Sequence, residues 1–136
     1  MADYGNKKTL QFSPAEQLER GTRALEQGRF RKAVKLLKGA VTVEDDPKRL
    51  LPAHANLCVA HYQLKAYEEA ETQCNAALAI TPDHYEALVN RGNIHFKRGE
   101  WEAAAGDYEA ALKTRPGEIA IAAQLIRVRA ILKRAD

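Results

Sequence analysis

The sequence predicts an all-α protein, an α-solenoid of three antiparallel helix pairs closed by a seventh, capping helix. The main observation is an internal repeat, since residues 51–84 match residues 85–118 at nine identical positions without a gap. A fixed period of this length indicates stacked supersecondary units. Small side chains recur at helical spacing within each unit, and Pro82 and Pro116 each stop the second helix of a pair. The identical pairs are Ala53/Ala87, Asn56/Asn90, His61/His95, Glu68/Glu102, Ala70/Ala104, Ala76/Ala110, Ala77/Ala111, Leu78/Leu112 and Pro82/Pro116.

The third unit carries a characteristic set of glycine, alanine, aromatic and proline positions: Gly92, Gly99, Trp101, Ala104, Tyr108, Ala111, Leu112 and Pro116. In this motif it resembles the tetratricopeptide repeat family, and the resemblance implies a right-handed superhelix with a concave groove that binds peptide segments. A first, weaker copy has Gly21, Gly28 and Phe30 in the same frame, offset by 37 residues instead of 34. We expect the three extra residues to form a loop or a one-turn helical extension between residues 44 and 51.

The chain divides into five segments of one domain. Residues 1–13 are predicted to be a flexible leader in which Leu10 and Phe12 fold back onto the first helix as a hydrophobic staple. Ser13 and Pro14 are predicted to start that helix. Residues 14–47, 48–84 and 85–117 are the predicted repeats, and residues 118–136 the capping helix. The leader lacks a secretory signal, and nowhere is there an apolar run long enough to span a membrane. A cytoplasmic protein is therefore expected.

The resemblance places a set of groove positions on the first helix of each pair and on the capping helix. They are Leu18, Glu19, Thr22, Leu25, Asn56, Val59, Tyr62, Gln63, Glu86, Val89, Asn90, Asn93, Phe96, Lys97, Gln124, Arg127 and Ile131. Asn56, Asn90 and Gln124 share one register, so we expect their amides to grip the backbone of an extended peptide. The alternative is that asparagine at this position, which is common in the family, only helps the helix to start.

One function known in the family is tested by five of these positions. A carboxylate clamp for acidic chaperone tails needs lysine, asparagine, asparagine, lysine and arginine in that order. Their places are taken by Leu18, Thr22, Asn56, Glu86 and Asn90. Only Asn56 matches, and Glu86 repels a carboxylate. A co-chaperone of the clamp type is not expected.

The other reactive residue types favour structural roles. Cys58 and Cys74 are interpreted as two unpaired core thiols, with a disulfide left open. His54, His61 and His95 are interpreted as core or partly buried histidines, and no metal site is predicted. A basic stripe on the second helix of the first repeat is expected to be a solvated face, since the net charge is only +3 and no nucleic-acid partner is expected. The stripe is Arg31, Lys32, Lys35 and Lys38. No nucleophile motif or phosphate-binding glycine loop occurs, so neither an enzyme nor a cofactor is predicted.

The capping helix carries two apolar stripes. Ile121, Leu125, Val128 and Leu132 are expected to dock on the third repeat. A second stripe, Ile119, Ala123, Ile126 and Ala130, has no partner helix in this chain, so it is either exposed or a surface for self-association. The function predicted is a noncatalytic module that binds a peptide segment of another protein. The alternatives are a bacterial secretion or assembly chaperone, and a structural subunit that self-associates through the capping helix.

Overall fold

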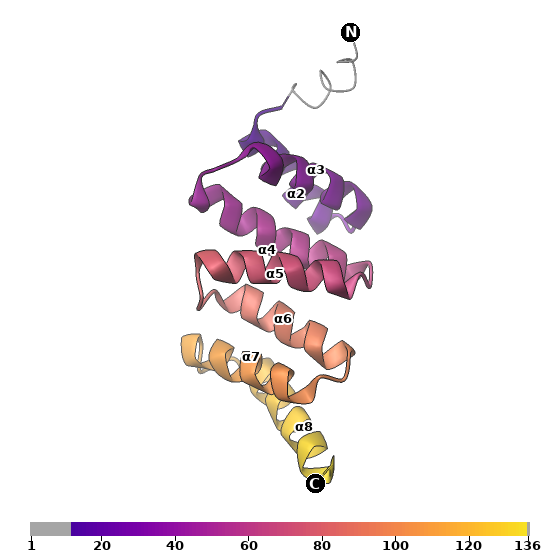
Figure 1. Cartoon of the computed structure of the whole chain (residues 1–136), viewed down its shortest axis with the longest axis vertical. Helices are drawn as coiled ribbons and strands as arrows, with labels where there is room; N and C mark the ends of the chain where they lie inside the picture. The colour runs from indigo at the N-terminus through magenta and orange to yellow at the C-terminus, as the bar shows by residue number, and fades with distance from the viewer. Residues whose placement is uncertain (1–11, 136) are drawn as a thin grey trace.

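The computed structural model describes residues 12–135, which form seven α-helices and no strand. The helices are α2 (Pro14–Glu26), α3 (Phe30–Val43), α4 (Pro47–Gln63), α5 (Tyr67–Ile80), α6 (Tyr85–Lys97), α7 (Trp101–Thr114) and α8 (Ile119–Ala135). They form the pairs α2/α3, α4/α5 and α6/α7, stacked along the long axis of the molecule, and α8 packs on α7 (Figure 1). The predicted α-solenoid is confirmed within the described residues. Residues 1–11 of the predicted flexible leader, including Leu10 of the predicted staple, lie outside the described residues. Phe12 and Ser13 are the part of the leader that the structure describes.

Side-chain caps start three of the helices. Ser13 and Glu16 form a reciprocal capping box, in which the Glu16 amide donates to Ser13 Oγ (3.2 Å) and the Ser13 amide to Glu16 Oε2 (2.7 Å). Asp46 accepts from the Lys48 amide, so α4 begins at Pro47. His84 caps α6 through its Nδ1 atom. The three extra residues are therefore accommodated by a helical extension of α4. This helix begins at residue 47, one residue before the predicted start of the second repeat at residue 48.

Each helix pair turns through one residue in the left-handed conformation. This residue is Gly28 (φ +75°) in the first pair, Lys65 (φ 61°) in the second and Gly99 (φ +72°) in the third. All three stand two residues after the last residue of the first helix of the pair, where glycine commonly ends a helix because it has no Cβ. The second pair thus makes the same turn with a side chain that this backbone geometry disfavours.

The paired helices approach most closely at one position in each repeat. A Cβ on Gly21 would lie 2.7 Å from Leu37 Cγ, and a Cβ on Gly92 would lie 2.7 Å from Tyr108 Cε1. The same position in the second repeat is occupied by Cys58 facing Cys74, and these two are joined by a disulfide across 5.2 Å between their Cα atoms. The interpretation as two unpaired thiols was therefore wrong. Two cysteines placed where the backbones almost touch are within bridging distance.

The core follows the stacking of the pairs. A smaller cluster of buried side chains joins the first pair to α4, and a larger one extends from α4 to α8. Tyr108, Leu37, Leu57 and Ile94 are the largest side chains with no measurable exposure. On α8, Ile121, Leu125 and Val128 are buried, as predicted for its docking stripe.

Candidate functional site

One face of the molecule is made by the first helix of each pair. Helices α2, α4 and α6 contact one another in sequence, and Arg127 of α8 lies over the Phe96 ring of α6. None of the twelve principal positions is fully buried: Leu18, Thr22, Asn56, Val59, Tyr62, Asn90, Asn93, Phe96 and Gln124 are half-buried, and Gln63, Lys97 and Arg127 are exposed. All of them therefore present at least part of a side chain to solvent.

A pocket of about 320 Å³ lies in this face between α4 and α6. Its lining residues are Ala55, Asn56, Val59, Tyr85, Glu86, Val89 and Asn90. Five of these seven are predicted groove positions, whereas Ala55 and Tyr85 were not predicted. The lining combines aliphatic side chains with two amides and one carboxylate. Such a surface can hold an apolar side chain while hydrogen-bonding the backbone that carries it.

The amides of the groove differ in what they already bind. Asn56 Nδ2 donates to Thr22 Oγ1 (3.0 Å), which links α4 to α2. Asn93 Oδ1 accepts from the hydroxyl of the buried Tyr108 (2.6 Å), and Gln124 Oε1 accepts from Arg127 Nη1 (3.2 Å). Asn90 has no side-chain partner within residues 12–135. Asn90 is therefore the groove amide whose donors and acceptor are all available to a ligand.

Two aromatic groove residues, Tyr62 and Phe96, lie near the C-terminal ends of α4 and α6. The Tyr62 and Tyr67 rings are 5.8 Å apart, and the Phe96 ring meets Trp101 edge to face at 5.3 Å. The Arg127 guanidinium lies 5.4 Å from the Phe96 ring centre, within cation–π range. Burial raises the pKa of the Tyr62 phenol, so it remains a neutral hydrogen-bonding group.

Glu86 gives the pocket its one negative charge. Its Oε2 atom accepts from Arg115 Nη2 (2.9 Å), and its Oε1 atom lies 3.7 Å from His84 Nε2. The side chain is 53% exposed, so the carboxylate remains in contact with solvent. The family resemblance places Glu86 at a lysine position of the carboxylate clamp, and Glu86 and Asn90 line the same pocket.

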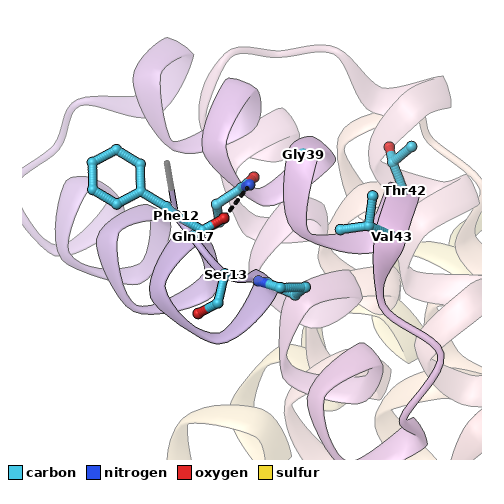
Figure 2. A pocket seen from close by; sticks show the side chains of 7 residues that line it. Phe12, Ser13, Gln17, Gly39, Thr42 and Val43 are labelled. Carbon is cyan, nitrogen blue, oxygen red and sulfur yellow. Dashed lines mark hydrogen bonds between the residues drawn. The ribbon is translucent and has the colours of Figure 1, made fainter. Parts of the chain in front are cut away.

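A second pocket, larger and unrelated to the predicted groove, lies at the α2 end of the molecule (Figure 2). It has a volume of about 440 Å³ and is lined by Phe12, Ser13, Pro14, Gln17, Gly39, Thr42 and Val43. Gln17 Nε2 donates to the Phe12 carbonyl (3.2 Å), as Figure 2 shows. Gln17 fits only because residue 39 is glycine, where a Cβ would lie 2.2 Å from Gln17 Oε1. Gly39 inside a predicted helix was the one sequence signal for this packing.

The histidines and the basic stripe are where the sequence placed them. His61 is buried, and His54 Nδ1 and His95 Nδ1 each lie 2.7 Å from a side-chain oxygen, of Gln73 and Glu100 respectively. All four side chains of the basic stripe are exposed on α3. Across residues 12–135 no group of three or more histidine, cysteine, aspartate or glutamate side chains is arranged to hold a metal ion. No helix in the same range is long and apolar enough to cross a membrane.

Stacked helix pairs with one continuous open face define a helical-repeat domain. The Tetratricopeptide repeat profile matches residues 24–92, about half of the chain, and a second profile of the same description matches residues 85–118. The chain belongs to the tetratricopeptide repeat (TPR) family.

Curated relatives share the repeats over part of their length. Peptidyl-prolyl cis-trans isomerase FKBP4 of Bos taurus is 27% identical over 139 residues, which cover 88% of this chain and 30% of the relative. RNA polymerase II-associated protein 3 of Homo sapiens is 30% identical over 112 residues, covering 81% of this chain and 16% of the relative. The chain thus spans less than a third of either relative.

Solved TPR domains have the same fold. The first TPR of Spaghetti (RPAP3), bound to the HSP90 peptide SRMEEVD, superposes with a TM-score of 0.81 at 24% identity, covering 89% of this chain and 94% of the other. The first TPR domain of human RPAP3 gives a TM-score of 0.76 at 25% identity, covering 89% and 93%.

Proposed function

We propose that this chain is a noncatalytic protein–protein interaction module that binds an extended peptide segment of a partner in the groove formed by α2, α4, α6 and α8. The observation that carries the proposal is the pocket between α4 and α6, in which the unpartnered Asn90 amide lies beside Val59 and Val89. The amide can hydrogen-bond a peptide backbone while an apolar side chain fills the space between the valines. Similar TPR domains solved with HSP90 and HSP70 peptides support this use of the fold.

The peptide is not expected to end in an acidic tail. Glu86 and Asn90 replace the lysine and arginine of the clamp, and Leu18 replaces its first lysine. A carboxylate placed in this pocket would face Glu86 instead of a cation. We therefore propose an internal segment with an apolar anchor residue, held mainly by backbone hydrogen bonds and apolar contact.

The experiment is selection of peptides from a displayed random library on the wild-type chain, followed by fluorescence anisotropy with the best binder. Asn90→Ala should weaken that peptide about tenfold, a loss of roughly 1.4 kcal/mol. The control is Asn75→Ala, which removes from α5, outside the groove, an exposed asparagine whose Oδ1 accepts from Arg91 Nη1 (3.0 Å), and it should leave the affinity within about twofold.

Two outcomes would contradict the proposal. One is a binder that is indifferent to both Asn90→Ala and Val59→Glu, which would place its site outside the pocket. The other is tight binding of the peptide SRMEEVD relative to a scrambled version, which would mean that an acidic tail is held without the clamp residues.

A further inference from the structure

The outward face of α8 is uncovered within the described chain. Ile119 is 83% exposed and Ile126 is 67% exposed, the two most exposed large apolar side chains between residues 12 and 135. Ala123 and Ala130 continue the same stripe and are exposed as well. This outer stripe lies on the opposite side of the helix from Ile121, Leu125 and Val128, which are buried against the third repeat. As Figure 1 shows, α8 is the last element of the stack.

The repeat frame shows what kind of element belongs on this face. Helix α8 begins 34 residues after α6, so Ile126 corresponds to Gly92. Gly92 is buried because α7 packs directly over it, with Tyr108 at contact distance. The face that carries Ile126 is therefore the one that receives a helix in every earlier pair. Because isoleucine replaces glycine here, the incoming helix must lie at an ordinary interhelical separation of roughly 8–10 Å.

The spacing of the outer stripe also favours a single helix as its occupant. Its four residues follow one another at intervals of four, three and four, the spacing of an a/d seam that pairs with one partner helix. A broad apolar face with aromatic residues would suit a lipid surface better. The stripe contains no aromatic residue.

The charged residues of α8 indicate the charge expected of the partner helix. Helix α8 contains Arg127, Arg129, Lys133 and Arg134 and no acidic residue. Arg129 is paired with Glu109 of α7, whereas Lys133 and Arg134 have no ion pair within residues 12–135. These two basic side chains flank the outer stripe at its C-terminal end, one on each side, and Arg127 flanks it nearer the middle.

The same charges disfavour a second copy of this chain stacked end to end. Residues 14–43, which form the opposite end of the stack, contain seven lysines and arginines against three glutamates. Both ends are therefore positive, while residues 44–118 between them carry thirteen acidic against eight basic side chains. Stacking α8 on α2 and α3 of another copy would bring like charges together.

We propose that the outer face of α8 binds an acidic amphipathic helix of a partner protein. Ile119 and Ile126 would enter the apolar seam of that helix, and Lys133, Arg134 and Arg127 would pair with carboxylates on its flanks. The interface is one helix wide and short, so binding is expected in the micromolar range and to weaken with salt. The site shares only Arg127 with the proposed groove, and it does not depend on the proposed function.

The test uses the full chain and a synthetic amphipathic peptide of about three heptads, with leucine in the seam and glutamate on both flanks. Its twin carries lysine in place of glutamate. We expect the acidic peptide to bind, the basic twin not to bind, and the affinity to fall as NaCl is raised. Ile126→Ser and the double variant Lys133→Glu, Arg134→Glu should each weaken binding by about tenfold or more.

Matched controls lie at the other end of the molecule. Val43→Ser removes an apolar side chain that is also 60% exposed, and Lys35→Glu with Lys38→Glu makes the same charge change on α3. Both controls should bind within about twofold of wild type. Absence of binding, equal binding of the basic twin, or an equal loss in the controls would overturn the proposal. An Ile126-dependent dimer in sedimentation, or Ile126-dependent binding to anionic vesicles, would also overturn it. Either result would show that the outer stripe binds a second copy of the chain or a lipid surface instead.

Discussion

At the scale of single residues, the three turns between paired helices form a natural comparison. Gly28 and Gly99 adopt the left-handed conformation without a Cβ, whereas Lys65 adopts it with a full side chain. A non-glycine residue there is disfavoured by about 1–2 kcal/mol, which is partly offset by the greater flexibility of glycine in the unfolded chain.

Lys65→Gly should therefore stabilise the protein by about 0.5–1 kcal/mol, measured as a higher urea midpoint. Gly28→Ala is the reciprocal control, because a Cβ at residue 28 has open space around it and only the backbone geometry opposes it. We expect Gly28→Ala to destabilise by about 1 kcal/mol. A shift of the urea midpoint in the same direction by both substitutions would contradict this explanation.

The buried His61 gives the stability a pH dependence near neutrality. Burial lowers the pKa of its imidazole below the usual 6.5, with Lys38 adding to the effect and Glu69 opposing it. The unfolded chain therefore binds this proton more readily than the folded chain. The contribution of His61 to the free energy of unfolding is therefore fully present above the unfolded-state pKa. It is lost as the pH drops through 6.5 toward the lowered pKa of His61 in the folded state.

Urea midpoints measured between about pH 7.5 and pH 5 should show this decline. That range lies above the window in which Glu16, Glu44 and Glu100 titrate, because their pKa values are lowered from 4.5. His61→Leu should have a flatter profile over the same range. An unchanged slope in His61→Leu would assign the decline to other groups.

At the scale of helices, one repeat places two glycines in opposite environments. A Cβ on Gly92 would lie 2.7 Å from Tyr108 Cε1 and 3.3 Å from the Asp107 Cβ, so α6 and α7 would have to move apart. Gly106 lies in the middle of α7, and a Cβ there meets nothing within 4 Å.

Alanine should consequently have opposite effects at the two positions. Gly92→Ala should destabilise by about 2 kcal/mol through overpacking, and Gly106→Ala should stabilise by about 0.5–1 kcal/mol through helix propensity. Thermal unfolding followed by circular dichroism distinguishes the two. Similar shifts for both variants would show that the close approach of α6 and α7 is not rigid.

Helix pairing was predictable from sequence because the repeat frame aligns glycines, alanines and prolines that have the same role in each copy. Hydrogen bonds between the side chains of different helices were not predictable. The Asn56–Thr22 bond depends on how closely α4 stacks on α2, and the Tyr108–Asn93 bond on the depth to which Tyr108 is buried. Three amides in one register were expected to act alike, yet Asn56 is engaged by Thr22 of α2 and Gln124 by Arg127 of its own helix, whereas Asn90 has no side-chain partner within residues 12–135. The sequence thus predicted the residues of the candidate surface. Only the structure distinguished the Asn90 amide, which has no side-chain partner, from the other amides.

At the scale of the whole molecule, the disulfide lies in the central pair, on which the pairs at both ends pack. It closes a loop with a sequence separation of 16 residues, for which the entropy estimate of stabilisation is about 3 kcal/mol. The sequence did not identify the bond, because cysteines 16 residues apart are also compatible with two small core residues.

Reduction should therefore lower the unfolding free energy by about 3 kcal/mol, and hydrogen exchange should show lost protection in α4 and α5 and in the helices packed on them. The double variant Cys58→Gly, Cys74→Leu copies the Gly21–Leu37 contact of the first repeat. It should be more stable than Cys58→Ser, Cys74→Ser under reducing conditions and insensitive to the reductant. If it unfolds as readily as the serine variant, the two repeats do not pack equivalently.

Ile126 bears on how such a protein can lengthen by gene duplication. A further copy of residues 85–118 inserted before α8 would give α8 the same kind of helix to pack on, so the array can grow from within. A helix added after α8 is different, because it would pack against Ile126 at an ordinary interhelical separation, where Gly92 allows α6 and α7 to approach closely. Internal duplication would thus repeat the close α6/α7 contact, whereas a pair built on α8 would be more widely spaced.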